Sequence, residues 1–148
     1  YEDVKQTLTE SGVSNSILYV NEFLFALEKG ISFNLDGNID IEHIMPKSGL
    51  NRENIMSDAG LESQEEFRDY AERIGNKILL EADINRSIQD SWFRSKRKNT
   101  ITSGHGYIGS KFPIAKSLVN YLNDTWTKTD IEAATEKAAT RIADFIFE

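Results

Sequence analysis

Two short segments about thirty residues apart restrict the fold more than any other feature of the chain. Residues 38–44 alternate apolar and polar side chains, which is typical of a half-buried strand, and Glu42 and His43 lie at its exit. Residues 77–80 indicate a second, apolar strand, and Asn85 follows just inside a helix. The predicted order is strand, strand, helix, with a carboxylate, an imidazole and an amide on neighbouring elements.

The rest of the chain is predicted to be mainly helical. Apolar periodicity and end signals favour helices at residues 2–11, 14–30, 63–75 and 113–123, a helical turn from 83 with a continuation at 92–100, and a last helix from 129. Residues 31–35 are expected to form a hairpin with the first strand, because Asp36-Gly37 suits a tight type I′ turn. The predicted fold class is α+β, mainly α: a helical domain built around a ββα-metal element.

Composition limits the domain organisation. A chain of 148 residues can form a single domain with its own core. The absence of cysteine excludes disulfides and thiolate metal sites.

No apolar run approaches the roughly 20 residues of a membrane helix, so we expect a cytoplasmic protein with no membrane partner. Because the sequence starts at Tyr1, we expect the C-terminal part of a longer protein, with helices of unclear role at 1–37 and the functional module at 38–148.

Charge is distributed unevenly along the chain. The net charge is −7, yet residues 91–123 contain six bases and no acid. These bases are Arg94, Lys96, Arg97, Lys98, Lys111 and Lys116. Aromatic side chains lie between them, and the stretch predicts a surface that binds DNA phosphates. The alternative is a solvated basic face that balances an acidic body.

The residues at the strand exit suit hydrolysis of a phosphodiester. An imidazole titrates near neutral pH, so His43 could take a proton from water. Oxygen ligands without thiolates suit Mg²⁺ or Mn²⁺. Glu42 is the first candidate ligand because it directly precedes His43, and Asn85 is the other. Asp40, two residues earlier on the same strand face, is a second choice or a supporting partner.

The chain resembles the C-terminal HNH, or His-Me finger, module of GmrSD-type restriction endonucleases. The resemblance lies in Glu-His-Ile-Met-Pro at 42–46, Ile-Gly-Asn-Lys-Ile-Leu-Leu at 74–80 and Ile-Asn-Arg-Ser at 84–87, with Lys96 downstream. It covers roughly residue 38 to the C-terminus. The central part is also similar to the HNH nuclease domain of RNA-guided DNA-cutting effectors.

This resemblance implies a role for each matching residue. His43 would be the general base, Glu42 and Asn85 the metal ligands, and Asn76 the middle residue that braces the loop holding His43. Lys96 would be an auxiliary phosphate contact. The resemblance also implies 5′-phosphate products, restriction of modified or phage DNA, and an N-terminal nucleotide-hydrolysing sensing domain in the full-length protein.

We therefore predict a metal-dependent HNH DNA endonuclease that acts by nicking or double-strand cleavage. Taken alone, His43 would more often be structural, and Asn76 or Asn85 would be ordinary turn and cap residues. Their order along the chain favours the nuclease. Two alternatives stay open: a non-catalytic DNA-binding or domain-docking module that retains the HNH scaffold, and a helical protein-interaction domain that uses its acidic face.

Overall fold

Helices surround one small sheet in this protein. The computed structural model describes residues 1–49, 51–97 and 106–148. Within them, the α-helices are α1 (Glu2–Thr9), α2 (Ser16–Lys29), α3 (Arg52–Asp58), α4 (Gln64–Ala71), α5 (Ala82–Ile88), α6 (Phe93–Arg97), α7 (Pro113–Ser117) and α8 (Lys128–Ile146). The other elements are β1 (Ile39–His43), β2 (Lys77–Glu81) and the 3-10 turns η1 (Ile74–Asn76) and η2 (Tyr107–Gly109). The predicted α+β, mainly α class is confirmed.

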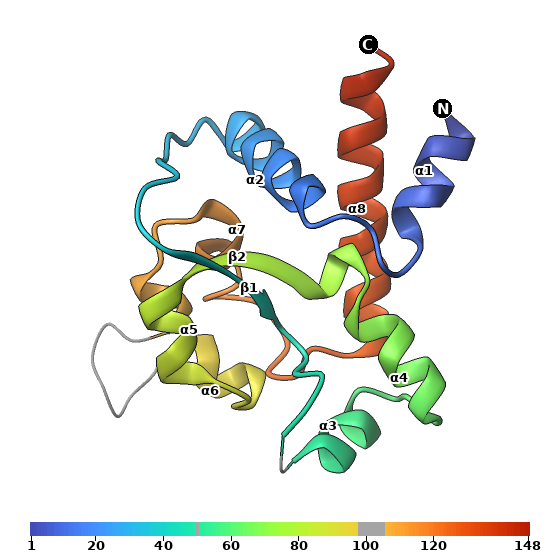
Figure 1. Cartoon of the computed structure of the whole chain (residues 1–148), viewed down its shortest axis with the longest axis vertical. Helices are drawn as coiled ribbons and strands as arrows, with labels where there is room; N and C mark the ends of the chain where they lie inside the picture. The colour runs from blue at the N-terminus through green and yellow to red at the C-terminus, as the bar shows by residue number, and fades with distance from the viewer. Residues whose placement is uncertain (50, 98–105) are drawn as a thin grey trace.

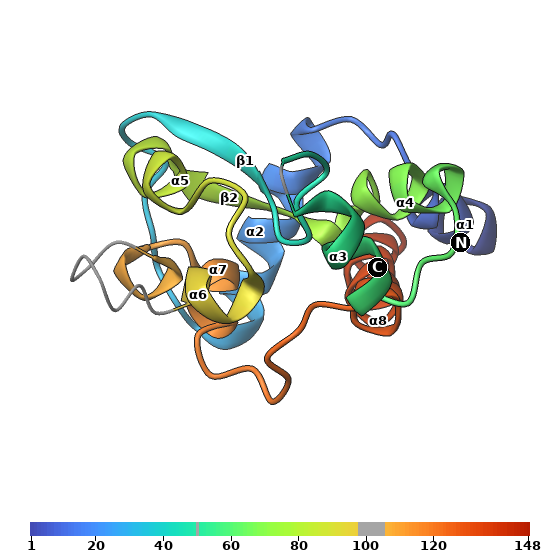
Figure 2. The same ribbon diagram turned by 90° about the horizontal axis from the view of Figure 1, so that it is seen from below.

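The N-terminal helices pack against the C-terminal helix. α8 runs along one side of the molecule, and α1, α2 and η1 pack against it (Figure 1). Both termini lie at the same end, where the ring centroids of Tyr1 and Phe147 are 5.9 Å apart. The strands, α5 and α6 lie toward the other side (Figure 2). Leu8 of α1 and Leu18 of α2 are buried in the main hydrophobic core, so α1 and α2 share that core with the site-bearing elements.

β1 pairs with β2 in an antiparallel sheet of two strands. Ile39 lies opposite Glu81, and His43 lies opposite Lys77. α5 begins directly after β2 and packs against both strands. Two strands and a helix therefore form one unit, in the order that the sequence predicts.

The predicted hairpin is wrong, because residues 31–36 form no strand. The partner of β1 is instead the segment 77–81, whose first four residues are buried and can cover the strand with apolar side chains. Phe33 is partly buried and packs against the core, with its ring centroid 4.9 Å from Phe23 and 5.8 Å from Phe112. Burial of apolar side chains thus outweighs the local turn signal.

Side chains at the helix ends account for several boundaries. Ser63 accepts the N–H of Glu66 at 3.0 Å, so the predicted start of α4 is confirmed. α8 starts slightly earlier than predicted, because Thr127 and Asp130 form a reciprocal capping box. α2 ends where Gly30 adopts a φ of +66°, which a residue with a side chain rarely does.

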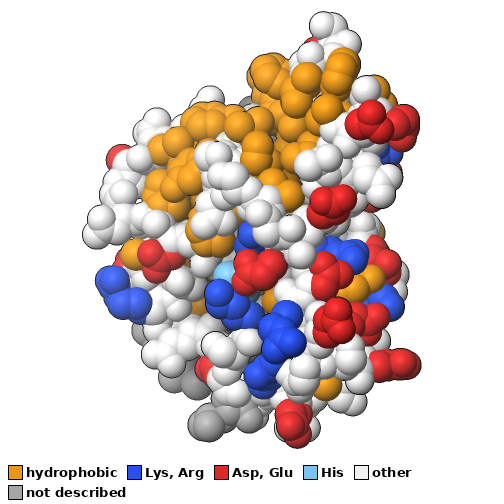
Figure 3. All heavy atoms as spheres, turned by 45° about the vertical axis from the view of Figure 1, so that its right-hand side comes forward, with side chains coloured by type: hydrophobic (Ala, Val, Ile, Leu, Met, Phe, Trp, Pro, Cys, Tyr) orange, Lys and Arg blue, Asp and Glu red, His pale blue; other side chains and the backbone are white. Residues whose placement is uncertain are grey.

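α2 buries one face and exposes another. Leu18 and Glu22 point into the molecule, whereas Phe23 and Leu27 are 49% and 76% exposed. Hydrophobic side chains gather on the upper part of the face in Figure 3. The helix is therefore only partly a core element.

η1 lies directly against the backbone of α8. The N–H of Gly75 donates to Thr135 Oγ1 at 3.0 Å. A Cβ atom at Gly75 would collide with the carbonyl oxygen of Ile131. Only glycine fits this approach, and it fixes the segment that leads into Asn76 and β2.

Glu22 is a carboxyl group inside the protein. The residue is fully buried, and its Oε2 accepts the N–H of Ile114 at 2.9 Å. Oε1 has no hydrogen-bond partner in the described part of the chain. Burial raises the pKa of Glu22 to about 7; the Ile114 N–H and Arg141 oppose the shift, and Glu81 adds to it.

We expect Glu22→Gln to change how stability depends on pH. Unfolded glutamates titrate near pH ~4.3, so the native state holds this proton more tightly than the unfolded chain. The resulting stability is complete below that pH and falls by roughly 4 kcal/mol as the pH rises through about 7. Glutamine keeps the acceptor for Ile114 without the charge. Urea unfolding should therefore show a more stable variant at pH 8 and convergence toward pH 4.

The exposed residue Glu65 supplies the matched control. Glu65→Gln should leave the pH dependence of the unfolding free energy as it is in the parent protein. Identical pH profiles for the parent and for Glu22→Gln would contradict the raised pKa of Glu22.

Candidate active site

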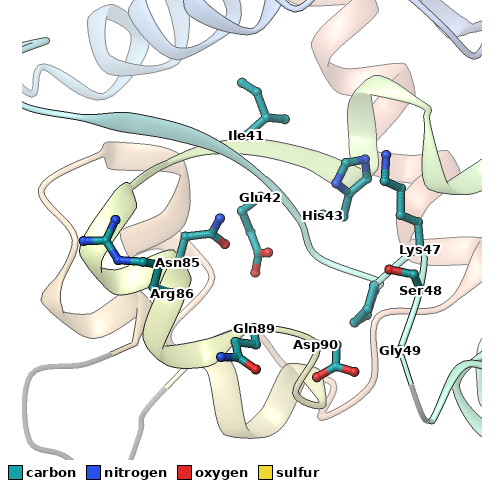
Figure 4. A pocket seen from close by; sticks show the side chains of 11 residues that line it. Ile41, Glu42, His43, Lys47, Ser48, Gly49, Asn85, Arg86, Gln89 and Asp90 are labelled. Carbon is teal, nitrogen blue, oxygen red and sulfur yellow. The ribbon is translucent and has the colours of Figure 1, made fainter.

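The exit of β1 and the turn between α5 and α6 enclose a cavity of about 500 Å³. Three of the predicted site residues line it: Glu42 and His43 from β1, and Asn85 from α5 (Figure 4). The loop after β1 contributes residues 46–49, and the α5–α6 turn contributes residues 89 and 90. The pairing of β1 with β2 and the position of α5 thus bring these three side chains to one place.

Two donors hold the carboxylate of Glu42, which is only 4% exposed. Oε2 accepts a hydrogen bond from the Tyr107 hydroxyl at 2.7 Å and lies 3.0 Å from the Lys96 ammonium. Both of these contacts use the same oxygen, and they leave Oε1 for a ligand. Burial raises the pKa of Glu42, and the charge of Lys96 and the Tyr107 hydroxyl oppose that shift.

Lys96 is a core residue. Its ammonium also donates to the carbonyl oxygens of His43 and Ile44 at 2.9 and 3.2 Å, and the side chain is fully buried. Burial lowers the pKa of Lys96, and the charge of Glu42 opposes this. The expected contact with a DNA phosphate does not fit, because the ammonium has no exposed surface.

His43 faces a carboxylate from another element. Its Nε2 lies 3.1 Å from Oε1 of Glu72, the residue that ends α4. Glu72 also lies 3.4 Å from the Lys47 ammonium and 3.7 Å from that of Lys77. Burial lowers the pKa of His43 although Glu72 acts in the opposite direction, so the imidazole is neutral near pH 7. If Nε2 carries the proton toward Glu72, Nδ1 is the nitrogen that can accept one.

The buried amide of Asn76 joins three segments. Its Oδ1 accepts the N–H of Met45 at 2.7 Å, and its Nδ2 donates to the carbonyl oxygens of Met45 and Ala71 at 3.0 and 3.1 Å. Its own carbonyl accepts the N–H of Ile44 at 2.9 Å. These bonds hold the backbone directly after His43.

Asn85 turns its amide nitrogen toward Asp40, with Nδ2 donating to Oδ2 at 3.1 Å. Its amide oxygen faces the side of Glu42 (Figure 4). Asn85 Oδ1 and Glu42 Oε1 are oxygens of the kind that could hold a hard cation. Across residues 1–49, 51–97 and 106–148, no three Asp, Glu, His or Cys side chains cluster in a way that could hold a metal. A cation here would keep several water ligands.

Most of the basic segment makes contacts within the molecule. Arg97 and Lys111 form ion pairs with acidic side chains, and Lys116 donates to a backbone carbonyl. Arg94 is exposed, and Lys98 lies outside the described residues. Of the expected DNA contacts, Arg94, Lys111 and Lys116 are at the surface.

Four residues at the site were not predicted from the sequence. Glu72 and Tyr107 contact His43 and Glu42 across 29 and 65 residues of chain, so no local pattern reveals them. The other two, Lys47 and Arg86, are cations that line the cavity. Lys47 directly follows the motif at 42–46, and Arg86 lies inside the motif at 84–87 without a predicted role. Basic and acidic side chains surround the imidazole on the face in Figure 3.

The rim of the cavity contains two unusual backbone positions. Gln89 has a φ of +44°, and a positive φ is uncommon for a residue with a side chain. Gly49 has a φ of +123°, and a Cβ there would collide with the carboxylate of Asp90. The turn after α5 therefore touches the loop after β1 directly.

Comparison with known proteins identifies the family of this chain. Residues 2–140 match the family described as GmrSD restriction endonucleases, C-terminal domain. The chain belongs to this family. The match to the GmrSD domain begins well before residue 38 and takes in α1 and α2, which the resemblance in the sequence left unassigned. No curated protein and no solved structure matches the chain.

Membership of the GmrSD family gives the chain a function related to restriction endonucleases. It implies nuclease activity with DNA as the substrate. None of the helices in the described ranges combines the length and the apolar character needed to cross a bilayer.

We expect Asn76→Ala to lower the free energy of unfolding by about 3 kcal/mol, because each buried polar group left without a partner costs roughly 1–3 kcal/mol. Urea denaturation measures the change. Asn54 is exposed on α3, and Asn54→Ala is the matched control, with an expected change below about 0.5 kcal/mol. A loss in Asn76→Ala no larger than in the control would show that these hydrogen bonds do not support the fold.

Proposed function

We propose that this GmrSD-family chain is a metal-dependent HNH endonuclease, which nicks or cuts both strands of DNA in the restriction of modified or phage DNA. The observation that carries the proposal is that Glu42, His43 and Asn85 line one cavity. Glu42 and His43 come from β1 and Asn85 from α5, and the order β1, β2, α5 is that of a ββα-metal finger. Asn76 holds the backbone next to His43 and supports the same assignment.

His43 would act as the general base. With Nε2 engaged by Glu72, Nδ1 is the atom that would take a proton from water. The resulting hydroxide would attack the scissile phosphorus and displace the 3′-oxygen, which leaves a 5′-phosphate. The carboxylate of Glu72 would stabilise the imidazolium that forms.

Glu42 and Asn85 would hold Mg²⁺ or Mn²⁺ through Oε1 and Oδ1. Asp40 would keep the amide of Asn85 in place, since the Asn85 nitrogen donates to it. The bound cation would stabilise the negative charge that develops on the phosphate and on the leaving oxygen. These oxygen donors suit hard ions that keep part of their hydration shell.

Exposed cations near the cavity support DNA as the substrate. Lys47 and Arg86 line opposite ends of it in Figure 4 and suit the phosphates on either side of the scissile one. Arg94, Lys111 and Lys116 would extend the contact. In the full-length protein, an N-terminal nucleotide-hydrolysing domain would sense the modification, and this chain would supply the cleavage.

One observation favours a non-catalytic DNA-binding or domain-docking module instead. Glu42 is buried in an ion pair with Lys96, as expected of a carboxylate with a structural role. The two functions differ in one measurable property, which is phosphodiester cleavage.

A plasmid assay separates these functions. With Mg²⁺ or Mn²⁺, the chain should convert supercoiled plasmid to nicked or linear forms on a gel. His43→Ala should lower the rate by about 10²–10⁴-fold while leaving DNA affinity and the unfolding midpoint near the parental values, because it removes the proton acceptor and little else. Cleavage by His43→Ala at the parental rate would make His43 structural. No cleavage by the parent chain with either ion would favour the non-catalytic module.

The metal ligands are tested by the dependence of the rate on Mn²⁺. Asn85→Ala leaves the ion pair of Glu42 intact and should raise the half-saturating Mn²⁺ concentration by at least about tenfold. Glu42→Ala should do the same and also destabilise the protein, since Lys96 would lose its partner. Asp40→Ala should have a smaller effect. Cleavage that persists in EDTA would contradict the assignment of a metal site.

A further inference from the structure

A buried network of side chains holds Glu42 at the cavity. Lys96 on α6 and Tyr107 on η2 both contact Oε2 of Glu42, and Lys96 also donates to the carbonyl oxygens of His43 and Ile44. We propose that Lys96 and Tyr107 are positioning residues that fix the Glu42 carboxylate, and the backbone at His43, for binding of a divalent cation. This inference rests on the proposed function, in which Glu42 is a ligand of that cation.

The orientation of the Lys96 ammonium is determined by its acceptors. An ammonium has three N–H bonds, and Nζ has three acceptors within 3.2 Å: the carbonyl oxygens of His43 and Ile44, and Oε2 of Glu42. Two of them are consecutive backbone carbonyls at the end of β1. The Lys96 ammonium therefore fixes both the main chain at His43, the proposed base, and the side chain of Glu42, the proposed metal ligand.

The hydroxyl of Tyr107 restricts the carboxylate further. It donates to the same oxygen of Glu42, Oε2, at 2.7 Å, and the Tyr107 side chain is itself fully buried. These two side-chain donors, Lys96 and Tyr107, both engage Oε2 and so fix the rotation of the carboxylate. Oε1 is then the oxygen presented by a residue that lines the cavity.

A geometric role explains this network better than a contribution to stability. Moving a carboxylate and an ammonium out of water is costly, and an apolar pair of the same volume is often at least as stable. A buried pair with satisfied donors does confine both groups to one arrangement. Support of this kind around a metal ligand raises ion affinity, because less reordering accompanies binding.

Tyr107→Phe removes the hydroxyl and keeps the aromatic packing. The ring of Tyr107 lies 6.5 Å from that of Phe93. Tyr121→Phe is the matched control, because Tyr121 lies 6.0 Å from the same ring and donates its hydroxyl to Asp130, which does not line the cavity. Electron paramagnetic resonance of Mn²⁺ bound to the protein without DNA should show a roughly tenfold loss of affinity in Tyr107→Phe. Tyr121→Phe should keep the parental affinity.

The outcomes of this experiment separate the inference from the proposed function. If the parent binds Mn²⁺ and Tyr107→Phe binds it equally well, or if both variants lose affinity equally, the positioning role is overturned and metal-dependent cleavage stands. If the parent binds no Mn²⁺, the metal site and the positioning role are overturned together.

Lys96→Met tests the same network through DNA binding. A buried positioning residue makes no phosphate contact, so the log–log salt slope of DNA affinity, measured by fluorescence anisotropy, should equal that of the parent while Mn²⁺ affinity falls. A slope reduced by roughly one would identify a phosphate contact and overturn the positioning role of Lys96. If Lys96→Met does not fold, Tyr107→Phe decides the question, because that variant retains the ion pair.

Discussion

Within the described residues β1 has a single strand as its neighbour, and the register of this pair determines where the site lies. His43 ends the paired stretch next to Asn76, whose amide reaches the backbone of Met45 just beyond the strand. α5 follows β2 directly and brings Asn85 to the edge of the cavity. Because side chains alternate along a strand, a slip of one residue would turn Glu42 away from its buried partners. The proposed base, ligands and brace are thus held together by one short sheet.

The charges of the basic segment act mostly inside the molecule. Lys96 neutralises a buried carboxylate, and Arg97 and Lys111 pair with acids from other segments. Each of these pairs reduces the positive potential that a DNA strand would meet. A count of bases along the chain overstates the basic surface, since it does not separate a buried ammonium from an exposed one. Lys47 and Arg86 belong to acidic stretches of sequence and yet line the cavity.

Features with local signals could be predicted from the sequence. The cap at Ser63 and the apolar run of β2 depend on neighbouring residues and lie where expected. The hairpin was wrong because Asp36-Gly37 favours a turn, whereas the choice of strand partner depends on apolar burial that a turn signal does not report. The motif residues of the site have no such local signal, and they were chosen from their order along the chain and from the resemblance to the GmrSD module. Glu72 and Tyr107 could not be predicted, because only tertiary packing brings them to the strand exit.

The contact between Gly49 and Asp90 has a mechanical consequence for the cavity. The backbone of Gly49 lies so close to the Asp90 carboxylate that not even a methyl group fits between them. The two rims therefore come closer at this point only if the Asp90 side chain turns away. The width of the entrance thus depends on the rotamer of one side chain, and a bulkier residue at position 49 would displace the Asp90 carboxylate from the rim and be strained at a φ of +123°.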